Sequence, residues 1–217
     1  MDLKELSSKT VLILGAGNTG IASAYFLLNK AGSVLLSESQ DEPLTSKDKI
    51  HHLKQAGVEV EFKKNSDAFL RKADLVIISP GISPQLEIVK KINSLKTPII
   101  SDIELAKNFI TKPIIAVTGT NGKTTTTSLI THLINNSGKK AVACGNIGEP
   151  LIGVINKDKN NADYYVLEIS SFQIFYSPTL SPDIAVCLNI TSDHLDWHGN
   201  LNHYIETKKK IIFTVQS

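Results

Sequence analysis

Short runs of apolar residues alternate along this chain with longer stretches whose apolar residues recur at helical spacing. Continuous apolar runs of this length suit parallel strands that are buried on both faces. The expected strands are Thr10–Leu14, Ser33–Ser37, Val58–Phe62, Asp74–Ser79, Ile99–Ile100, Ile114–Val117, Ala141–Ala143, Tyr164–Ile169 and Asp183–Ile190. Strands that alternate with helices are typical of parallel sheets covered on both faces, so the pattern predicts an α/β fold.

The chain divides near its middle. Two proline-containing segments, Lys96–Pro98 and Thr111–Pro113, bracket an expected helix over Ser101–Ile110, for which Ser101 is a suitable N-cap. The strand after Pro113 begins a new nucleotide-binding unit, and 217 residues suffice for two small domains. We therefore expect a Rossmann-like domain over residues 1–105 and a second α/β domain over residues 106–217.

The most informative stretch is a glycine-containing turn between a strand and a helix. The strand ends at Val117, Gly119 and Gly122 lie in the turn, and Lys123 and Thr124 open the helix. Backbone N–H groups of such a turn bind phosphate, the lysine adds positive charge, and the threonine hydroxyl suits a magnesium ion. Val117 replaces the first glycine of the usual P-loop, so the loop is a variant. The alternative is an ordinary strand-to-helix turn.

The helix that follows this turn has an apolar face at helical spacing. Its expected apolar positions are Leu129, Ile130, Leu133 and Ile134.

The N-terminal half carries a second glycine loop, Gly15–Gly20, between a strand and a helix. Glu38 ends the next strand, about 20 residues on, as in a dinucleotide-binding βαβ unit. A Rossmann-like domain that holds another ligand explains the pattern equally well. The turn Ser79–Pro84 follows a further strand at the sheet edge where such folds bind ligands, although a plain turn is equally consistent.

Polar residues also follow the strands of the second half. Asn146 lies between two glycines and presents an amide, or else marks a simple turn. Glu168 is an acid within an apolar strand, which is costly without a cation, so it is a candidate magnesium ligand. Capping of a neighbouring helix is the alternative for Glu168.

The last strand leads into Thr191–Gly199, which holds two histidines and two aspartates where chemistry is expected. Taken alone, either histidine fits a surface loop equally well. The triplet Lys208–Lys210 lies in an expected helix over Tyr204–Phe213, and by composition it indicates a solvated face.

Bulk composition narrows the class of protein. Hydrophobic residues make up 41% of the chain and the net charge is only +2, which argues against nucleic-acid or membrane-surface partners. Two separated cysteines, Cys144 and Cys187, suit a reducing compartment. We expect a cytoplasmic protein.

Together these motifs resemble those of the Mur ligases, ATP-dependent amide-forming enzymes of peptidoglycan precursor synthesis. The residues that carry the resemblance are Thr118–Thr125, Gly145–Gly148, Glu168–Gln173 and Asn189–Asp196, with the spacing from His194 to Tyr204 and Lys208. Within the family, Gly15–Gly20, Ser79–Ile82 and Ser170–Gln173 favour the member that adds D-glutamate to UDP-N-acetylmuramoyl-L-alanine through an acyl phosphate.

The resemblance implies roles for individual residues. ATP would bind Gly119, Thr120, Asn121, Gly122, Lys123, Thr124 and Thr125. Two Mg²⁺ ions would bind Thr124, Glu168, His194 and a carbamylated Lys208, and Lys123, His194 and Lys208 would serve catalysis. The UDP-linked substrate would bind Thr19, Gly20, Glu38, Gly81, Asn146 and Ser170.

The family implies three domains, of which this chain holds the first and part of the central P-loop ATPase domain, without the C-terminal ligase domain. The alternatives are a truncated, non-catalytic remnant that binds UDP-substrate or ATP, and an NAD-dependent oxidoreductase built on the first half. The resemblance favours a monomer for the full-length protein, and the sequence leaves the oligomeric state open.

Overall fold

The computed structural model describes residues 3–158 and 161–214. The chain forms two compact units, Met1–Asn108 and Phe109–Ser217. Each unit is built on one parallel sheet. The predicted α/β fold is therefore confirmed. No helix in the described ranges is long and apolar enough to cross a membrane.

The first unit contains a five-stranded parallel sheet of order β3-β2-β1-β4-β5. Its strands are β1 (Thr10–Leu14), β2 (Ser33–Glu38), β3 (Glu59–Phe62), β4 (Leu75–Ile78) and β5 (Ile99–Ile100). The central strands β1 and β4 are almost completely buried, as their continuous apolar sequences predict. The carboxyl ends of β1, β2 and β4 therefore bring the glycine loop, Glu38 and Ser79 to one edge.

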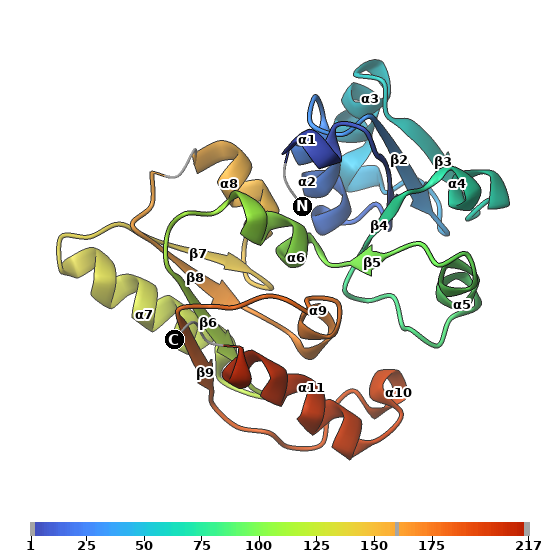
Figure 1. Ribbon diagram of the computed structural model, residues 1–217. Coiled ribbons are helices and arrows are strands. Elements are labelled where there is room, and N and C mark those ends of the chain that lie inside the picture. Colours follow the sequence, from blue (N-terminus) through green and yellow to red (C-terminus); the bar gives the residue numbers. More distant parts are fainter. Residues whose placement is uncertain (1–2, 159–160, 215–217) are drawn as a thin grey trace. The chain divides into compact units, whose positions relative to one another are not determined.

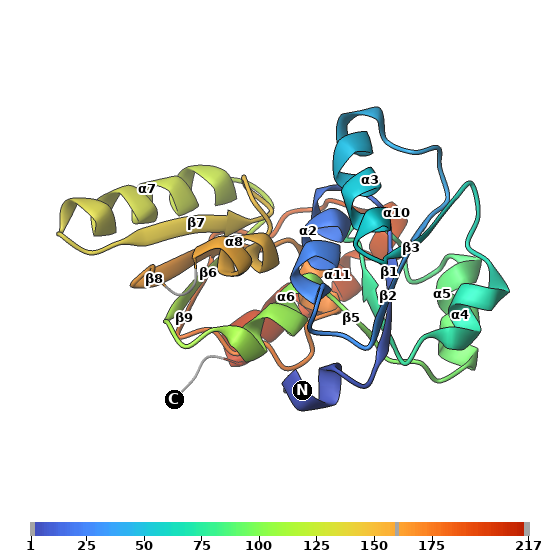
Figure 2. The same ribbon diagram turned by 90° about the horizontal axis from the view of Figure 1, so that it is seen from above.

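Helices cover both faces of this sheet, with α2 on one side and α4 on the other (Figures 1 and 2). The helices are α1 (Leu3–Leu6), α2 (Asn18–Leu27), α3 (Lys47–Gln55), α4 (Asp67–Lys72), α5 (Glu87–Ser94) and α6 (Asp102–Ala106), with 3₁₀ turns η1 (Leu44–Ser46) and η2 (Lys107–Phe109).

The helix expected over Ser101–Ile110 is shorter than predicted. Ser101 is its N-cap, because its hydroxyl accepts the Glu104 N–H at 3.0 Å. The α-helix ends at Ala106 and continues as the 3₁₀ turn. The Asn108 amide donates to the carbonyls of Glu104 and Leu105, at 3.1 and 3.2 Å, and so satisfies the carbonyls at the helix end.

The second unit contains a four-stranded parallel sheet of order β7-β8-β6-β9. Its strands are β6 (Ile114–Thr118), β7 (Ala141–Gly145), β8 (Tyr164–Glu168) and β9 (Ile184–Cys187). Its helices are α7 (Lys123–Asn136), α8 (Leu151–Asp158), α9 (Ser171–Phe175), α10 (Leu195–His198) and α11 (Leu201–Phe213). Because β6 lies between β8 and β9, the loop after β6 is flanked by the carboxyl ends of both neighbours.

Helix α7 runs beside β7 and β8 (Figure 1), but only part of its apolar sequence faces the sheet. Ile130 and Ile134 pack against the cluster of Ile115, Val117, Ala141 and Val166. Leu129 and Leu133 are 53% and 58% exposed. The predicted helix is therefore present, and its four apolar positions at i, i+1, i+4 and i+5 span more of the helix circumference than the sheet covers.

The strand expected over Asp183–Ile190 is also shorter and less buried than predicted. It ends at Cys187, and Ile184 is 52% exposed because β9 lies at the edge of the described sheet. Beyond it, the Leu188 N–H donates to the Thr118 carbonyl at 3.1 Å. The chain then turns toward the loop that follows β6.

Substitution of Gly20 tests whether close backbone packing in the Gly15–Gly20 loop requires glycine. A Cβ atom at Gly20 would lie 1.8 Å from the Gly15 carbonyl oxygen, where only backbone can yield. We expect Gly20→Ala to lower the free energy of unfolding by about 3 kcal/mol, the upper range for overpacking. Urea unfolding of the 217-residue protein measures this.

Gly17→Ala is the matched control. A Cβ at Gly17 meets nothing within 4 Å, and its φ of −75° suits alanine. This variant should unfold within about 0.5 kcal/mol of the parent. Equal losses in the two variants would contradict the steric role of Gly20.

Candidate functional site

The turn between β6 and α7 has backbone features that a phosphate-binding loop would need. Gly122 adopts φ +84° as the N-cap of α7, and Gly119 adopts φ +150°. A Cβ at Gly119 would also lie 3.2 Å from the Leu188 Cβ, so both positions require glycine. The loop leads directly into the N-terminus of a 14-residue helix, whose unpaired N–H groups attract anions.

The Lys123 ammonium lies at this loop. Its Nζ donates to the Thr120 carbonyl at 2.9 Å, which holds the positive charge over the turn. Thr125 lies in the first turn of α7, two residues beyond Lys123. The strand, loop, lysine and helix are thus arranged as the sequence predicted.

Below the loop lies a buried carboxylate, Glu168, at the end of β8 with 2% exposure. Its Oε2 accepts the Thr124 hydroxyl at 2.8 Å, and its Oε1 accepts the Asn146 amide at 2.9 Å. Both of these partners are neutral groups. These two hydrogen bonds therefore stabilise the Glu168 carboxylate without bringing a cation to it. A hydroxyl beside a buried carboxylate is an oxygen donor pair that suits Mg²⁺. Thr124 lies in the first turn of α7, so Glu168 also places its negative charge near the N-terminus of that helix.

Behind the loop lies a buried cation, Lys208, with 2% exposure. Its Nζ donates to the Gly119 carbonyl at 3.0 Å and to the Thr118 hydroxyl at 3.3 Å. It also lies 4.9 Å from the centre of the Tyr204 ring. Burial, and secondly the charge of Lys123, lowers the pKa of Lys208 to about 8.

The two neighbours of Lys208 behave differently. Lys209 and Lys210 are exposed, and the Lys209 ammonium lies 2.8 Å from the Glu206 carboxylate. The solvated-face interpretation of the triplet is therefore right for these two residues and wrong for Lys208.

His194 lies at the start of α10, at φ +52°. Its ring lies 4.8 Å from that of Phe172 and 6.5 Å from that of Tyr204, measured between centres. Its Nε2 lies 3.4 Å from the Asp193 carboxylate.

The predicted metal ligands are only partly assembled. The structure brings Thr124 and Glu168 into contact. Across residues 3–158 and 161–214, no three His, Cys, Asp or Glu side chains form a group able to hold a metal ion. Magnesium commonly uses one or two carboxylates together with water and substrate phosphates, so the Thr124–Glu168 pair still fits that ion.

Sequence reasoning missed a buried polar contact between α9 and α10. His198 is 4% exposed, with Nε2 2.9 Å from the Ser171 hydroxyl and Nδ1 3.2 Å from the His203 Nδ1. Burial, followed by the charge of His203, lowers the pKa of His198 to about 4. The Trp197 ring lies beside it, 4.6 Å away and 4.8 Å from Phe172. Nothing local in the sequence distinguishes His198 from a surface residue.

Ser170, a predicted substrate residue, is the N-cap of α9. Its hydroxyl accepts the Gln173 N–H at 3.3 Å and lies 3.0 Å from the Gln173 side-chain oxygen, which in turn accepts the Ser170 N–H. This is a capping box, and it fixes the start of α9 beside the end of β8.

In the first unit, the Glu38 carboxylate accepts two hydrogen bonds from backbone N–H groups. Its Oε2 accepts the Ala16 N–H of the glycine loop at 2.9 Å, and its Oε1 accepts the Gln40 N–H at 2.9 Å. A pocket of about 200 Å³ opens beside it, lined by Leu14, Gly15, Gly17, Ser37, Glu38, Ser39, Asn65, Ser79, Ile82 and Ile88.

Only Glu38, of the four substrate residues predicted in this unit, lines that pocket. The Thr19 carbonyl accepts the Ser23 hydroxyl within α2, Gly20 supports the loop, and Gly81 is exposed. Ser79 lines the pocket, and its buried hydroxyl has no hydrogen-bond partner among the described residues.

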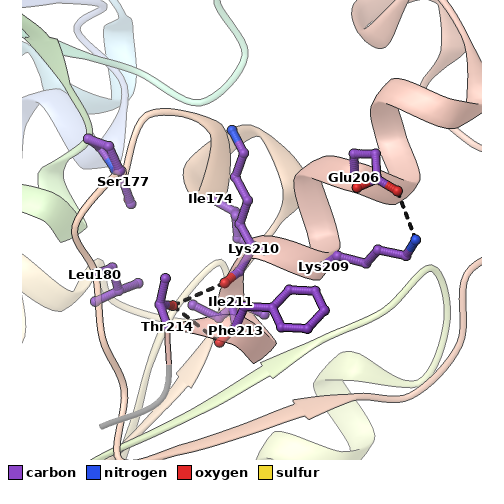
Figure 3. Close-up of a pocket in the computed structure, with 10 residues that line it drawn as sticks. Ile174, Ser177, Leu180, Glu206, Lys209, Lys210, Ile211, Phe213 and Thr214 are labelled. Carbon is purple, nitrogen blue, oxygen red and sulfur yellow. Dashed lines mark hydrogen bonds and ion pairs between the residues drawn. The ribbon is translucent and has the colours of Figure 1, made fainter.

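A second pocket, of about 280 Å³, lies along α11 (Figure 3). Its lining residues are Ile174, Ser177, Pro178, Leu180, Glu206, Lys209, Lys210, Ile211, Phe213 and Thr214. None of these is a predicted site residue, and its acid Glu206 pairs with Lys209.

Buried Lys208 generates a pH-dependent prediction. The unfolded chain keeps Lys208 protonated up to about pH 10.5, whereas the folded chain loses that proton near pH 8. The unfolded state thus binds more protons between these values, and the free energy of unfolding rises with pH. We expect a contribution of about 2 kcal/mol, which Lys208→Met removes.

Urea unfolding in carbon dioxide-free buffer at pH 7.5 and 10 measures this difference. Lys209→Met, which alters an exposed neighbour, should retain the rise of the parent protein. A parallel pH profile for the parent and Lys208→Met would contradict the assignment.

Comparison with known proteins agrees with this arrangement. The family model described as Mur ligase MurD-like, N-terminal domain matches residues 9–101, and the Mur ligase middle domain model matches residues 117–217. The UDP-N-acetylmuramoylalanine–D-glutamate ligase of Desulfosudis oleivorans is 38% identical over 207 residues, covering 95% of this chain and 45% of that protein. The ligase of the same name from Koribacter versatilis is 41% identical over 210 residues, covering 95% and 45%. The chain thus spans about half the length of these curated relatives.

Solved structures share the fold. The UDP-N-acetylmuramate:L-alanyl-gamma-D-glutamyl-meso-diaminopimelate ligase from Neisseria meningitides aligns with a TM-score of 0.60 at 23% identity, covering 97% of this chain and 69% of that one. A murein peptide ligase from Psychrobacter arcticus aligns with a TM-score of 0.56 at 20% identity, covering 96% and 47%. With both of its units matched by domains of one family, the chain belongs to the Mur ligase family.

Proposed function

We propose that this protein is an ATP-dependent ligase that adds D-glutamate to UDP-N-acetylmuramoyl-L-alanine in peptidoglycan precursor synthesis. The observation that carries the proposal is the contact between the Thr124 hydroxyl and the buried Glu168 carboxylate below a glycine loop that bears Lys123. The names of these two curated relatives supply the substrates.

The reaction proceeds through an acyl phosphate. The substrate carboxylate attacks the γ-phosphorus of ATP and releases ADP. The D-glutamate amine then attacks the acyl carbon, and inorganic phosphate leaves as the amide forms and the amine loses a proton. Such chemistry depends on positioning and charge neutralisation, which the N–H groups at the N-terminus of α7 and Lys123 provide.

Magnesium, when bound, neutralises phosphate charge, and Thr124 and Glu168 are the residues that would hold it. We propose that His194 and a carbamylated Lys208 serve a second ion. A lysine with a pKa of about 8 has roughly a quarter of its amine neutral at pH 7.5. The neutral amine adds to carbon dioxide, a proton is released, and the buried cation becomes an anionic oxygen ligand.

The UDP end of the substrate would bind the first unit, with Glu38 facing sugar hydroxyls at its pocket and Thr19, Gly20 and Gly81 nearby. Asn146 and Ser170 would reach the sugar and alanyl part. The proposal implies a cytoplasmic protein, acting as a monomer on small molecules without nucleic-acid or membrane partners.

A second candidate is a non-catalytic module that binds UDP-substrate or ATP, since the phosphate loop by itself accounts for nucleotide binding without turnover. ADP release with UDP-N-acetylmuramoyl-L-alanine and D-glutamate separates the two, because turnover excludes the module. Titration with NADH tests the oxidoreductase alternative, which requires saturable binding.

The phosphate site is tested by Lys123→Ala. Loss of one phosphate counter-charge should weaken MgATP binding to the 217-residue protein at least about tenfold, measured by isothermal titration calorimetry. Lys139→Ala, which alters an exposed lysine beyond the far end of α7, should bind like the parent. An unchanged dissociation constant for Lys123→Ala would refute the proposed loop function.

The carbamate is tested by ¹³C NMR of protein equilibrated with ¹³C-bicarbonate. We expect a carbamate carbonyl resonance in the parent and in Lys209→Met, and its loss in Lys208→Met. A resonance that survives in Lys208→Met would assign the carbamate to another amine.

A further inference from the structure

The phosphate loop is held by a side chain from the neighbouring strand end. Asn189 follows β9, and its carboxamide bonds both backbone groups of Asn121. The Asn189 Oδ1 accepts the Asn121 N–H at 3.0 Å, while its Nδ2 donates to the Asn121 carbonyl at 3.1 Å. One amide side chain therefore pairs with a residue of the loop as a neighbouring strand would.

Backbone and hydroxyl contacts extend this pairing to the preceding loop residue, Thr120. The Thr120 N–H donates to the Asn189 carbonyl at 3.0 Å. The Thr120 hydroxyl accepts the Thr191 N–H at 3.0 Å and lies 3.0 Å from the Tyr204 hydroxyl. The segment 189–191 thus fixes two consecutive residues of the loop.

These contacts have a consequence for the phosphate site. The Asn121 N–H is already committed to Asn189, so it is not free to bind phosphate. The N–H groups free of intrahelical partners are those of the first turn of α7, which begins two residues later. Holding Asn121 therefore sets the direction from which the loop enters α7.

The loop residues that Asn189 holds lie outside regular secondary structure. Thr120 and Asn121 are not part of a strand or helix. A loop already ordered before the ligand arrives loses less conformational entropy on binding.

We propose that Asn189 is a positioning residue that pre-organises the phosphate loop for the triphosphate of ATP. This inference rests on the proposed nucleotide function and adds a residue to it. The side chain acts through the Asn121 backbone and not by contacting the nucleotide.

The chain contains a matched control elsewhere. Asn135, near the end of α7, makes the same reciprocal pair with the backbone of Ala141 at the start of β7. The Ala141 N–H donates to Asn135 Oδ1 at 2.9 Å, and Asn135 Nδ2 donates to the Ala141 carbonyl at 3.2 Å. Asn135→Ala therefore removes the same two kinds of hydrogen bond at the opposite end of the helix.

The experiment compares MgATP affinity in the 217-residue protein and its variants by titration calorimetry. We expect Asn189→Ala to bind about tenfold more weakly, and Asn135→Ala to bind within twofold of the parent. Asn189→Asp keeps the size but replaces the amide donor by an oxygen facing the Asn121 carbonyl, and it should also lose about tenfold. Equal affinities in the parent and Asn189→Ala would overturn the proposal.

Hydrogen exchange of the Asn121 amide, followed by NMR without nucleotide, separates positioning from direct contact. We expect slowed exchange in the parent and in Asn135→Ala, and faster exchange in Asn189→Ala. Weaker binding with unchanged Asn121 exchange would mean that Asn189 touches the nucleotide, and would overturn the positioning role.

The exchange measurement also stands apart from the proposed function. If the parent protein binds no MgATP, the nucleotide proposal fails, whereas exchange at Asn121 still decides whether Asn189 orders the loop. Rapid Asn121 exchange in the parent would overturn the inference without any variant.

Discussion

Two opposite charges are buried beside the loop that joins β6 and α7, and each is hydrogen-bonded to neutral groups. Glu168 is satisfied by a hydroxyl and an amide, and Lys208 by a carbonyl and a hydroxyl. Burial of a charge costs free energy that such bonds only partly offset. The sheet order β7-β8-β6-β9 makes the arrangement possible, because it sets the phosphate loop between the strand that ends in Glu168 and the strand that leads to Asn189. The second unit therefore holds the charges of Glu168 and Lys208 beside a loop where the charge of a bound ligand can compensate them.

The two units hold their glycine loops in a similar way but with different side chains. In each, a glycine loop follows a strand and is bonded by a side chain from the end of a neighbouring strand. In the first unit that side chain is the Glu38 carboxylate, bonded to the Ala16 N–H. In the second it is the Asn189 amide, bonded to Asn121. A carboxylate repels phosphate but accepts hydrogen bonds from sugar hydroxyls. A neutral amide, by contrast, leaves the electrostatic potential at the loop positive.

Local sequence carried enough information for the strands, the glycine loops and the Ser101 cap, because each depends on neighbours within a few residues. Local sequence did not predict burial where the burial of a residue depends on its neighbours in the sheet. The apolar run Asp183–Ile190 looked buried, yet β9 lies at an edge, and two of the four apolar positions of α7 face solvent. Lys208 could not be distinguished from Lys209 by pattern, since its burial depends on residues 118–119 of a distant strand end. The resemblance singled out Lys208, and the structure shows that it differs from Lys209 in being buried.

The aromatic packing around α10 gives this protein an optical reporter. Trp197 is the one tryptophan in the sequence, and its ring lies against Phe172 of α9 and against His198. Its fluorescence therefore reports on a single place, where α10, which carries Trp197, packs against α9. Movements of these helices can be watched without attaching a dye.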